Sequence, residues 1–339
     1  MMNPTRLAHL KFVLLAVAMI VLWHLAASSL PSEEEQALAE RVRAAQKHVA
    51  AWRTANGTNA THEHDPGGCG LIGVEWSALT TTLGSLEAKR TACDPLWAIR
   101  FHRWYEKAGL VAGDTVAIYS SASFPGLLLS AVAAAEAYGL EPLLVVSLGA
   151  SSWGANRLDL PWPVLGLELR RAGFLATRAD YYTLGGGSET GGGMAPETVE
   201  DLRSAARAAG VPLLRAVTLE EVIIQKTELL ERRGARLLIS IGGSQANLGN
   251  DPEILGLSPG FHVPGERSPA GDGVIGAALS DGIPVVHVLN VRELAARSGI
   301  AFDPRVQAKA PLRVKPVWAL LALSLFFGVL LTHRRWRLV

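Results

Sequence analysis

The sequence contains no Gly-Lys dipeptide. The glycine-rich loop of P-loop nucleotide hydrolases needs that dipeptide, so this loop and an ATP-driven ligase built on it are excluded. Only two of the 339 residues are cysteines, which is too few to define a disulfide pattern. The chain has no internal repeat and no low-complexity tract. With 49% hydrophobic residues, it can bury a large core in one α/β domain or two small ones.

Acidic residues are missing from both ends of the chain. Residues 1–11 and 333–339 contain five of the 32 Lys and Arg residues and none of the 31 Asp and Glu residues. The body between these tails therefore holds 27 basic and 31 acidic residues. A mildly acidic body argues against a nucleic-acid partner.

Two long apolar segments lie between the basic tails and the body. Residues 12–30 have about the length that a bilayer core requires, and residues 316–332 form a shorter apolar segment followed by three arginines. We predict that both are transmembrane helices. A cleaved signal peptide is the alternative for the first, and a buried core helix is the alternative for the second.

The number of Lys and Arg residues beside the two segments does not decide their orientation. Long loops cross the membrane largely regardless of their charge, and the tails are purely basic, so we place the tails in the cytoplasm and the body outside. A capping box at Ser32 and Glu35 predicts a helix to about Thr54, which we interpret as a stalk. The predicted order is a basic tail (1–11), a transmembrane helix (12–30), a helical stalk and linker (31–68), an α/β domain (69–303), a linker (304–315), a transmembrane helix (316–332) and a basic tail (333–339).

The body alternates strand and helix patterns. Thr115–Tyr119 and Leu143–Val146 are short apolar runs without polar alternation, which is typical of strands in a parallel sheet covered on both faces. Between them, Gly126–Tyr138 is a helix that is apolar on most sides. Seven strand candidates alternate with helices and predict an α/β fold with a mostly parallel, doubly wound, Rossmann-like sheet. The other five candidates are Leu71–Trp76, Phe174–Thr177, Leu213–Leu214, Arg236–Ile241 and Pro284–Leu289.

Loops rich in Gly, Ser or Asn follow several of these strands. In a parallel sheet such loops meet at the carboxyl edge of the strands, where ligands bind. Hydroxyls and backbone N–H groups near helix starts suit an anion such as a carboxylate or phosphate. The alternative is that small residues merely make tight turns. The loops are residues 120–123, 147–157, 185–193, 242–250 and 290–293.

Residues 73–90 are too polar for a core and too apolar for a linker. We expect Lys89 and Arg90 to face a carboxylate, and Glu75 to orient a hydroxyl or accept from an amine. The alternative is a capped helix with a solvated charged face. The predicted substrate-binding residues are Glu75, Ser77, Thr80, Thr81, Thr82, Lys89, Arg90, Ser121, Ser123, Ser151, Ser152, Asn156, Arg157, Gly242, Gly243 and Asn290.

Catalytic residues are not defined by any complete motif. Ser123 at a helix start and Ser151 in a glycine-flanked loop are candidate nucleophiles, and His287 on the last strand is a candidate base. The alternative for His287 is a packed or hydrogen-bonded core histidine.

Other familiar sites are weakly indicated. The glycines of a Gly-x-Gly-x-x-Gly motif at 271–276 do not directly follow a strand, so we interpret them as a helix start and predict no cofactor. His62, His64 and Asp65 lie in a linker without an evident fourth ligand, so no metal site is predicted.

The two cysteines, Cys69 and Cys93, both lie in the body. If the body is outside the cytoplasm, they can pair in a disulfide. The alternative is two unrelated buried thiols.

Four ordered strings carry a family resemblance. They are GVEWSALTTTLGSLEAKR at 73–90, SFPGL at 123–127, SLGASSWGAN at 147–156 and IPVVHVLNVREL at 283–294. Together they resemble the poly-γ-glutamate system protein family, membrane-anchored bacterial proteins that accompany the machinery of poly-γ-glutamate synthesis. The likeness covers nearly the whole body and brings no catalytic residues with it.

This resemblance implies a role in making, exporting or anchoring poly-γ-glutamate, with the membrane subunits of the synthase as partners. We expect the pocket to bind the anionic polymer or a small carboxylate. One alternative is a γ-glutamyl hydrolase or transferase that uses Ser123 or Ser151. Another is a purely structural partner of the synthase subunits.

Overall fold

The computed structural model describes residues 12–22, 30–58, 63–265, 271–303 and 320–328. The chain divides into two compact units, one formed by residues 35–308 and the other by residues 1–34 and 309–339. The predicted basic tails (1–11 and 333–339), the linker (304–315) and parts of both predicted transmembrane helices lie outside the described residues.

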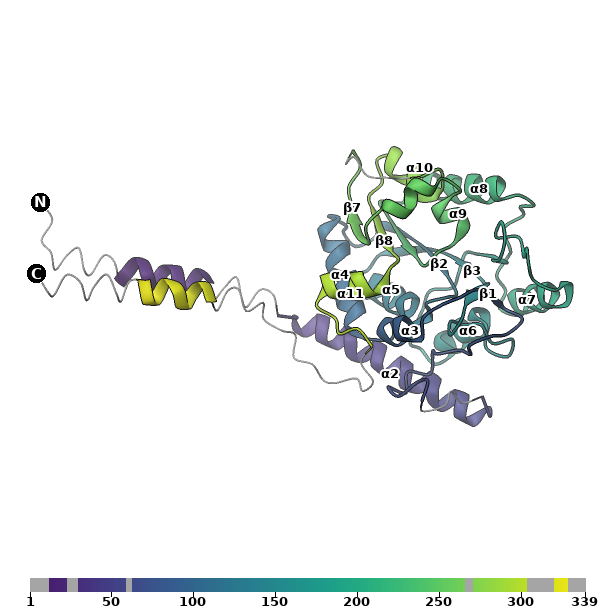
Figure 1. Cartoon of the computed structure of the whole chain (residues 1–339), viewed down its shortest axis with the longest axis horizontal. Helices are drawn as coiled ribbons and strands as arrows, with labels where there is room; N and C mark the ends of the chain where they lie inside the picture. Colours follow the sequence, from purple (N-terminus) through teal and green to yellow (C-terminus); the bar gives the residue numbers. More distant parts are fainter. Residues whose placement is uncertain (1–11, 23–29, 59–62, 266–270, 304–319, 329–339) are drawn as a thin grey trace, which may run out of the picture. The chain divides into compact units, whose positions relative to one another are not determined.

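A six-stranded sheet forms the centre of the larger unit (Figure 1), in the order β5-β3-β2-β6-β8-β7. All neighbouring strands are parallel except β7 and β8, which are antiparallel. The prediction of a mostly parallel α/β fold is therefore confirmed. The strands are β2 (Thr115–Ser121), β3 (Glu141–Ser147), β5 (Tyr181–Thr183), β6 (Leu237–Ile241), β7 (Gly260–His262) and β8 (Val285–Val288).

Successive side chains along each strand point to opposite faces of the sheet. Apolar side chains therefore lie on both faces, and helices cover both. On β2, Val116 and Ile118 belong to the larger core cluster, whereas Ala117 and Tyr119 belong to the smaller one. Helices α8 and α10 pack into the smaller cluster, and α4, α5, α6 and α11 pack into the larger one. The helices of the body are α3 (Leu86–Ala92), α4 (Leu96–Lys107), α5 (Pro125–Ala137), α6 (Trp162–Arg171), α7 (Pro196–Ala208), α8 (Leu219–Arg232), α9 (Gln245–Leu248), α10 (Val274–Ser280) and α11 (Val291–Ser298).

The topology places a switch point between β2 and β6. From β2 the chain moves outward through β3 to β5, then returns to the other side of β2 to form β6 and β8. The loops after β2 and β6 thus leave the sheet in opposite directions. A crevice opens at such a point in doubly wound sheets.

The strand predicted at Leu71–Trp76 is absent. The carbonyls of Gly70 and Ile72 instead accept hydrogen bonds from the Arg53 guanidinium, at 2.7 and 2.8 Å. The first strand is β1 (Thr80–Thr82), which pairs in parallel with β4 (Ala150–Ser151) in a separate two-stranded sheet.

Two further strand predictions are displaced. Phe174–Thr177 is not a strand, because the N–H groups of Ala176 and Thr177 donate to the Glu136 carboxylate instead of to a neighbouring strand. The edge strand forms later, at β5. Leu213 contributes only an isolated bridge to Tyr182.

The helix predicted after Ser32 is α2 (Glu33–Ala55), and it is part of the body. It buries one apolar stripe in the main core, and its Gln46 amide donates to the Cys93 carbonyl at 2.7 Å. This packing differs from the predicted stalk. The stripe consists of Leu38, Val42, Ala45 and Val49.

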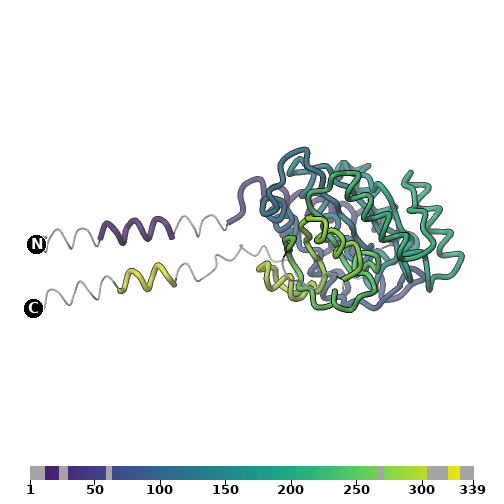
Figure 2. The backbone as a smooth tube through the Cα atoms, turned by 90° about the horizontal axis from the view of Figure 1, so that it is seen from above, coloured from purple at the N-terminus to yellow at the C-terminus, as the bar shows by residue number. Residues whose placement is uncertain are grey.

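Residues 12–22 and 320–328 are the described parts of the two predicted transmembrane segments. Both are helical, and Figure 2 traces them as separate coils. Within the described ranges of the chain, no helix has both the length and the apolar character needed to cross a membrane.

The packing of α2 can be tested with a pair of matched substitutions. We expect Val42→Asp to lower the free energy of unfolding by about 3 kcal/mol, because it removes a buried apolar side chain and buries a carboxylate without a counter-charge. Ala44→Asp, at an exposed position of the same helix, should cost less than about 1 kcal/mol. Urea denaturation followed by circular dichroism measures both values. Equally small effects would contradict the packing of α2 against the body.

Candidate functional site

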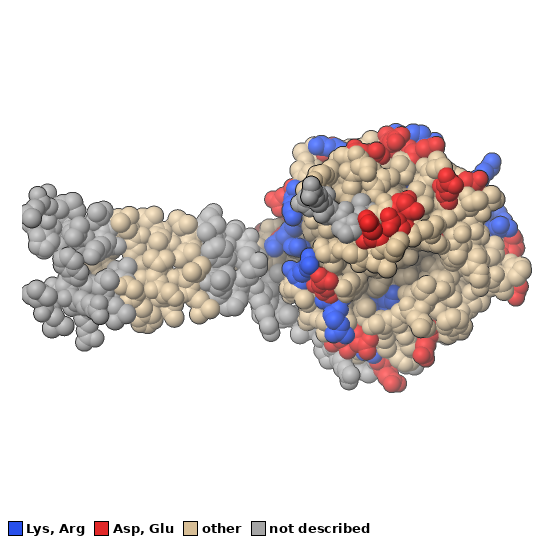
Figure 3. Space-filling view, turned by 45° about the horizontal axis from the view of Figure 1, so that its top comes forward, with Lys and Arg blue, Asp and Glu red and all other residues tan. Residues whose placement is uncertain are grey.

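A pocket of about 500 Å³ opens at the carboxyl edge of the sheet. All five parallel strands contribute to it through their last residues or the loops that follow, and the turn after β1 closes another side. The face in Figure 3 is hollowed, with a border formed mostly by uncharged residues. The lining comprises Thr81, Thr82, Leu83, Gly84, Ser85, Lys89, Ser121, Ser123, Phe124, Ser147, Gly149, Ser151, Gly186, Gly187, Glu189, Gly243, Ser244, Gln245 and Leu289.

The lining is rich in hydroxyl groups, and one of them has no partner. Ser121 at the end of β2 is 5% exposed, and among the described residues its Oγ has no hydrogen-bond partner. Gly242 packs against this hydroxyl so closely that a Cβ there would overlap it. A buried polar group without a partner costs free energy, so a ligand that bonds Ser121 would recover that cost.

Helix α5 begins at the pocket wall. Its N-cap, Phe124, makes no side-chain hydrogen bond, and Pro125 occupies the first turn. Within the described structure, the backbone N–H groups of Ser123 and Phe124 have no acceptor. Unpaired N–H groups at a helix start favour an anion.

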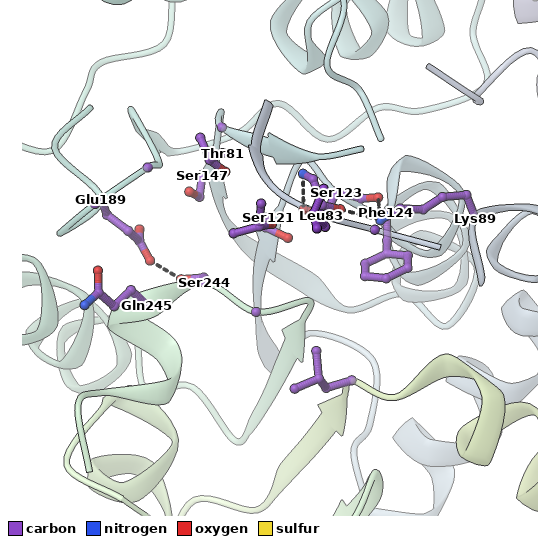
Figure 4. A pocket seen from close by; sticks show the side chains of 18 of the residues that line it. Thr81, Leu83, Lys89, Ser121, Ser123, Phe124, Ser147, Glu189, Ser244 and Gln245 are labelled. Atoms are coloured by element: carbon purple, nitrogen blue, oxygen red, sulfur yellow. Dashed lines mark hydrogen bonds between the residues drawn. The ribbon is translucent and has the colours of Figure 1, made fainter. Parts of the chain in front are cut away.

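Lys89 is the basic residue in this wall of the pocket, and only 3% of its surface is exposed. It lies on α3, and its Nζ donates to the carbonyl of Ser123 at 2.5 Å and to Oγ of Ser151 at 2.7 Å. The Nζ atom also lies 3.5 Å from the centre of the Phe124 ring. Burial lowers the pKa of Lys89 to about 7. Figure 4 shows Lys89 beside Phe124 at one end of the pocket.

Glu189 lines the opposite end of the pocket (Figure 4) and forms a buried salt bridge with Lys226, at 2.8 Å. Thr183, Ser244 and the N–H of Ala246 also donate to its carboxylate. Burial raises the pKa of Glu189, but the charge and hydrogen bond of Lys226 outweigh this and hold it below its usual value.

The same network fixes the loops around the pocket. Glu189 and Ser188 both adopt the left-handed conformation, with φ of 58° and 57°, which side-chain-bearing residues rarely do. Lys226 also donates to Asn247, whose amide in turn donates to the Tyr119 carbonyl. The salt bridge thus joins the glycine-rich loop after β5 to α8 and to the loop after β6.

Seven of the predicted binding residues line the pocket, and the structure brings them together from segments far apart in the sequence. They are Thr81, Thr82, Lys89, Ser121, Ser123, Ser151 and Gly243.

Three predicted binding residues have structural partners of their own. Asn156 bonds both the N–H and the carbonyl of Val74, and Thr80 and Ser77 bond to Asn156. This cluster ties the segment before β1 to the loop after β4, together with two backbone hydrogen bonds that Trp153 makes with Gly73 and Val74. It does not line the pocket.

The remaining predicted residues also lie outside the pocket lining. Arg90 points away from Lys89, because neighbouring helix residues face different directions. It bonds the carbonyls of Glu63 and His64, and the carboxylate that it faces is Asp303, at 3.3 Å. Arg157 pairs with Asp159, and Asn290 caps α11. The others are Glu75, which is exposed, Ser152, which is buried, and Gly242, which packs against Ser121.

The three catalytic candidates lie in different surroundings. Ser151 contacts Lys89, and its backbone N–H donates to Oγ of Ser123 at 3.0 Å. His287 is buried in β8, and among the described residues its Nδ1 has no partner. Burial lowers the pKa of His287 to about 4, and it does not line the pocket, so it is not placed to act as a base for either serine.

Cys69 and Cys93 are buried thiols whose sulfur atoms lie 2.8 Å apart. Burial raises the pKa of Cys69 well above its usual value, which disfavours its thiolate. The structure has two thiols here and not a disulfide, and their oxidation stays a prediction.

The other motifs have structural roles. Gly273 begins α10, and a Cβ there would lie 2.4 Å from the N atom of Gly249. His64 packs against Trp153, and the Asp65 carboxylate accepts from the N–H groups of Cys69 and Gly70. His62 lies outside the described residues. In the described ranges, no group of three or more metal-binding side chains occurs.

Sequence reasoning missed Glu189 and Lys226, although a signal for each exists. Glu189 is the one charged residue in the glycine-rich loop at 185–193. Lys226 occupies the apolar stripe of α8, in line with Leu219, Val222 and Leu229. A lysine on a buried helix face needs a counter-charge, and that requirement pointed to an acidic partner.

Comparisons of this chain with models of protein families, with curated proteins and with solved structures find no match.

The Lys226–Glu189 pair provides a stability test. Lys226→Met leaves a buried carboxylate without a counter-charge, so we expect the free energy of unfolding to fall by about 3–5 kcal/mol. Adding Glu189→Gln to Lys226→Met should restore a large part of that loss. Chemical denaturation of the two variants and the parent protein measures the effect.

The exposed pair of Arg236 and Asp114, also at 2.8 Å, is the control. Arg236→Met should change the free energy of unfolding by no more than about 1 kcal/mol. If Lys226→Met were equally mild, the buried pair would not support the loops as described.

Proposed function

We propose that this protein is a membrane-anchored component of a bacterial poly-γ-glutamate system, and that its pocket binds the carboxylates of the polymer or of a small acid. The observation that carries the proposal is the unsatisfied polar lining at the switch point. Ser121 has no partner among the described residues, and α5 begins there without a side-chain cap. Such groups favour an anion that accepts hydrogen bonds.

The charge and size of the pocket support the same ligand class. Lys89 is part of the lining, and no acidic side chain forms an ion pair with it in the described part of the chain. A volume of about 500 Å³ is within the range of small-molecule sites, so the pocket suits a monomer or the end of a polymer. The family resemblance supplies the choice of γ-linked glutamate over other carboxylates.

The membrane part of the proposal rests on the two apolar segments and the basic tails. In this arrangement both tails are cytoplasmic, the body is outside the cytoplasm, and the segments contact the membrane subunits of the synthase.

Gly243 offers a way to fill the pocket without straining the fold. It lines the pocket, and a Cβ there would meet nothing closer than 3.9 Å. We expect short poly-γ-glutamate to bind the full-length protein in detergent, and Gly243→Leu to weaken this binding at least tenfold. Gly243→Ala should have a smaller effect. Isothermal titration calorimetry measures the affinities.

Ala44→Leu on the exposed face of α2 is the control and should bind like the parent protein. Thermal melting shows whether each variant is folded. If Gly243→Leu leaves binding unchanged, the polymer binds elsewhere on the protein. If the parent protein does not bind the polymer at all, a purely structural partner of the synthase is favoured.

Membrane anchoring has its own test. We expect the full-length chain expressed in bacteria to stay in the membrane fraction after an alkaline carbonate wash. Deleting both residues 1–31 and 316–339 should release the body into the soluble fraction. A full-length chain that the wash removes would contradict the anchor, whatever the pocket binds.

A further inference from the structure

Lys89 and Ser151 form a side-chain pair that ligand binding alone does not require. Their Nζ and Oγ atoms are 2.7 Å apart, and both residues line the pocket. They come from α3 and β4, and Ser151 is 6% exposed. A nucleophile within hydrogen-bond reach of a base, at the wall of a pocket, is the arrangement that covalent catalysis needs.

We infer that Ser151 is a nucleophile and Lys89 its general base in acyl transfer, cleaving or transferring an amide or ester of the carboxylic acid that the pocket holds. The inference rests on the proposed function, because the pocket must first bind the acid. Ser–Lys pairs perform this chemistry on unrelated folds.

A lysine acts as a base only when its amine is neutral. Burial brings the pKa of Lys89 to about 7, whereas the Cys93 thiol acts in the opposite direction. A large fraction of Lys89 is therefore neutral at physiological pH. The other charged groups on the surrounding elements are Glu87 and Arg90 on α3, Glu136 on α5, Glu189 across the pocket, and Arg292, Glu293 and Arg297 on α11.

The contacts of Lys89 suit this role. A neutral amine can donate to the Ser123 carbonyl and keep its lone pair for the Ser151 hydroxyl proton. Lys226, the other buried lysine discussed above, forms an ion pair with Glu189, whereas Lys89 forms no ion pair within the described residues. Lys89 is thus the lysine placed to gain and lose a proton.

The reaction has two balanced steps. In the first, Ser151 Oγ attacks the carbonyl carbon while its proton moves to Lys89 Nζ. The intermediate then collapses, the bond to the leaving amine or alcohol breaks, and Lys89 returns the proton to that group. In the second, water or another amine attacks the acyl-serine ester, Lys89 takes its proton, and Ser151 is restored as an alcohol.

Two features of the backbone support the site. The N–H groups of Ser123 and Phe124 at the start of α5, unpaired within the described structure, are candidate donors to the negative oxygen of the intermediate. The chain also passes Ser151 at Gly84, where a Cβ would lie 2.8 Å from Oγ. Any larger residue at Gly84 would press on the nucleophile.

Labelling with a fluorophosphonate probe tests the pair in the full-length protein. We expect mass spectrometry to map the adduct to Ser151, and the labelling rate to rise with pH and level off above about 7 as Lys89 loses its proton. Lys89→Met should slow labelling at least about a hundredfold. Lys89→Arg should not rescue it, because arginine stays charged.

Ser204→Ala, an exposed position on α7, is the control and should label like the parent protein. Thermal melting checks the fold of every variant, and mapping the adduct on the parent protein needs no variant. An adduct on Ser123, or no adduct, would overturn the inference. The protein could bind the polymer in a way that Gly243→Leu blocks and still form no adduct. The pocket would then be a binding site only. If binding is also lost, the proposed function fails with it.

Discussion

The buried salt bridge between Lys226 and Glu189 is the interaction on which the pocket depends. Removing two charges from water is costly, and hydrogen bonds offset that cost: Thr183 and Ser244 donate to the Glu189 carboxylate, and Asn247 accepts from Lys226. Thr183 ends β5, Ser244 and Asn247 lie at the start of α9 after β6, and Lys226 itself is on α8, so the pair is fully bonded only when all three segments are in place. The glycine-rich loop is thereby held in a backbone conformation that its Ser and Glu residues would otherwise avoid.

The two buried lysines at the pocket show how the same side chain takes different roles. Lys226 pairs with a carboxylate and stabilises the loops around the pocket. Lys89 bonds two neutral oxygens and lies over an aromatic ring, and within the described residues no ion pair compensates its burial. A group in that position is more reactive than a paired one, and it lies where the doubly wound topology opens its crevice.

Much of the body could be predicted from the sequence because parallel strands and apolar helices have strong local patterns. β2, β3, β6 and β8 fall close to their predicted ranges, and serines at or after the carboxyl ends of β2, β3 and β6 meet in the pocket. No strand forms at the predicted Leu71–Trp76, where the Ile72 carbonyl accepts from the Arg53 guanidinium and the Val74 carbonyl accepts from Asn156 and from the N–H of Trp153. Hydrogen bonds from side chains to the backbone leave no periodic pattern in the sequence. The partnership of Lys89 with Ser151 was also hidden, since 62 residues separate them in the chain.

The position of Lys89 links ligand binding to protons in solution. An anion that enters the pocket favours the ammonium form and raises the pKa of Lys89, which otherwise lies near 7. Occupation of the site near neutral pH is then accompanied by proton uptake. The heat of association would vary with the ionisation enthalpy of the buffer, and a more acidic medium would increase the affinity. A solvent-exposed lysine, charged throughout this range, would produce no such coupling.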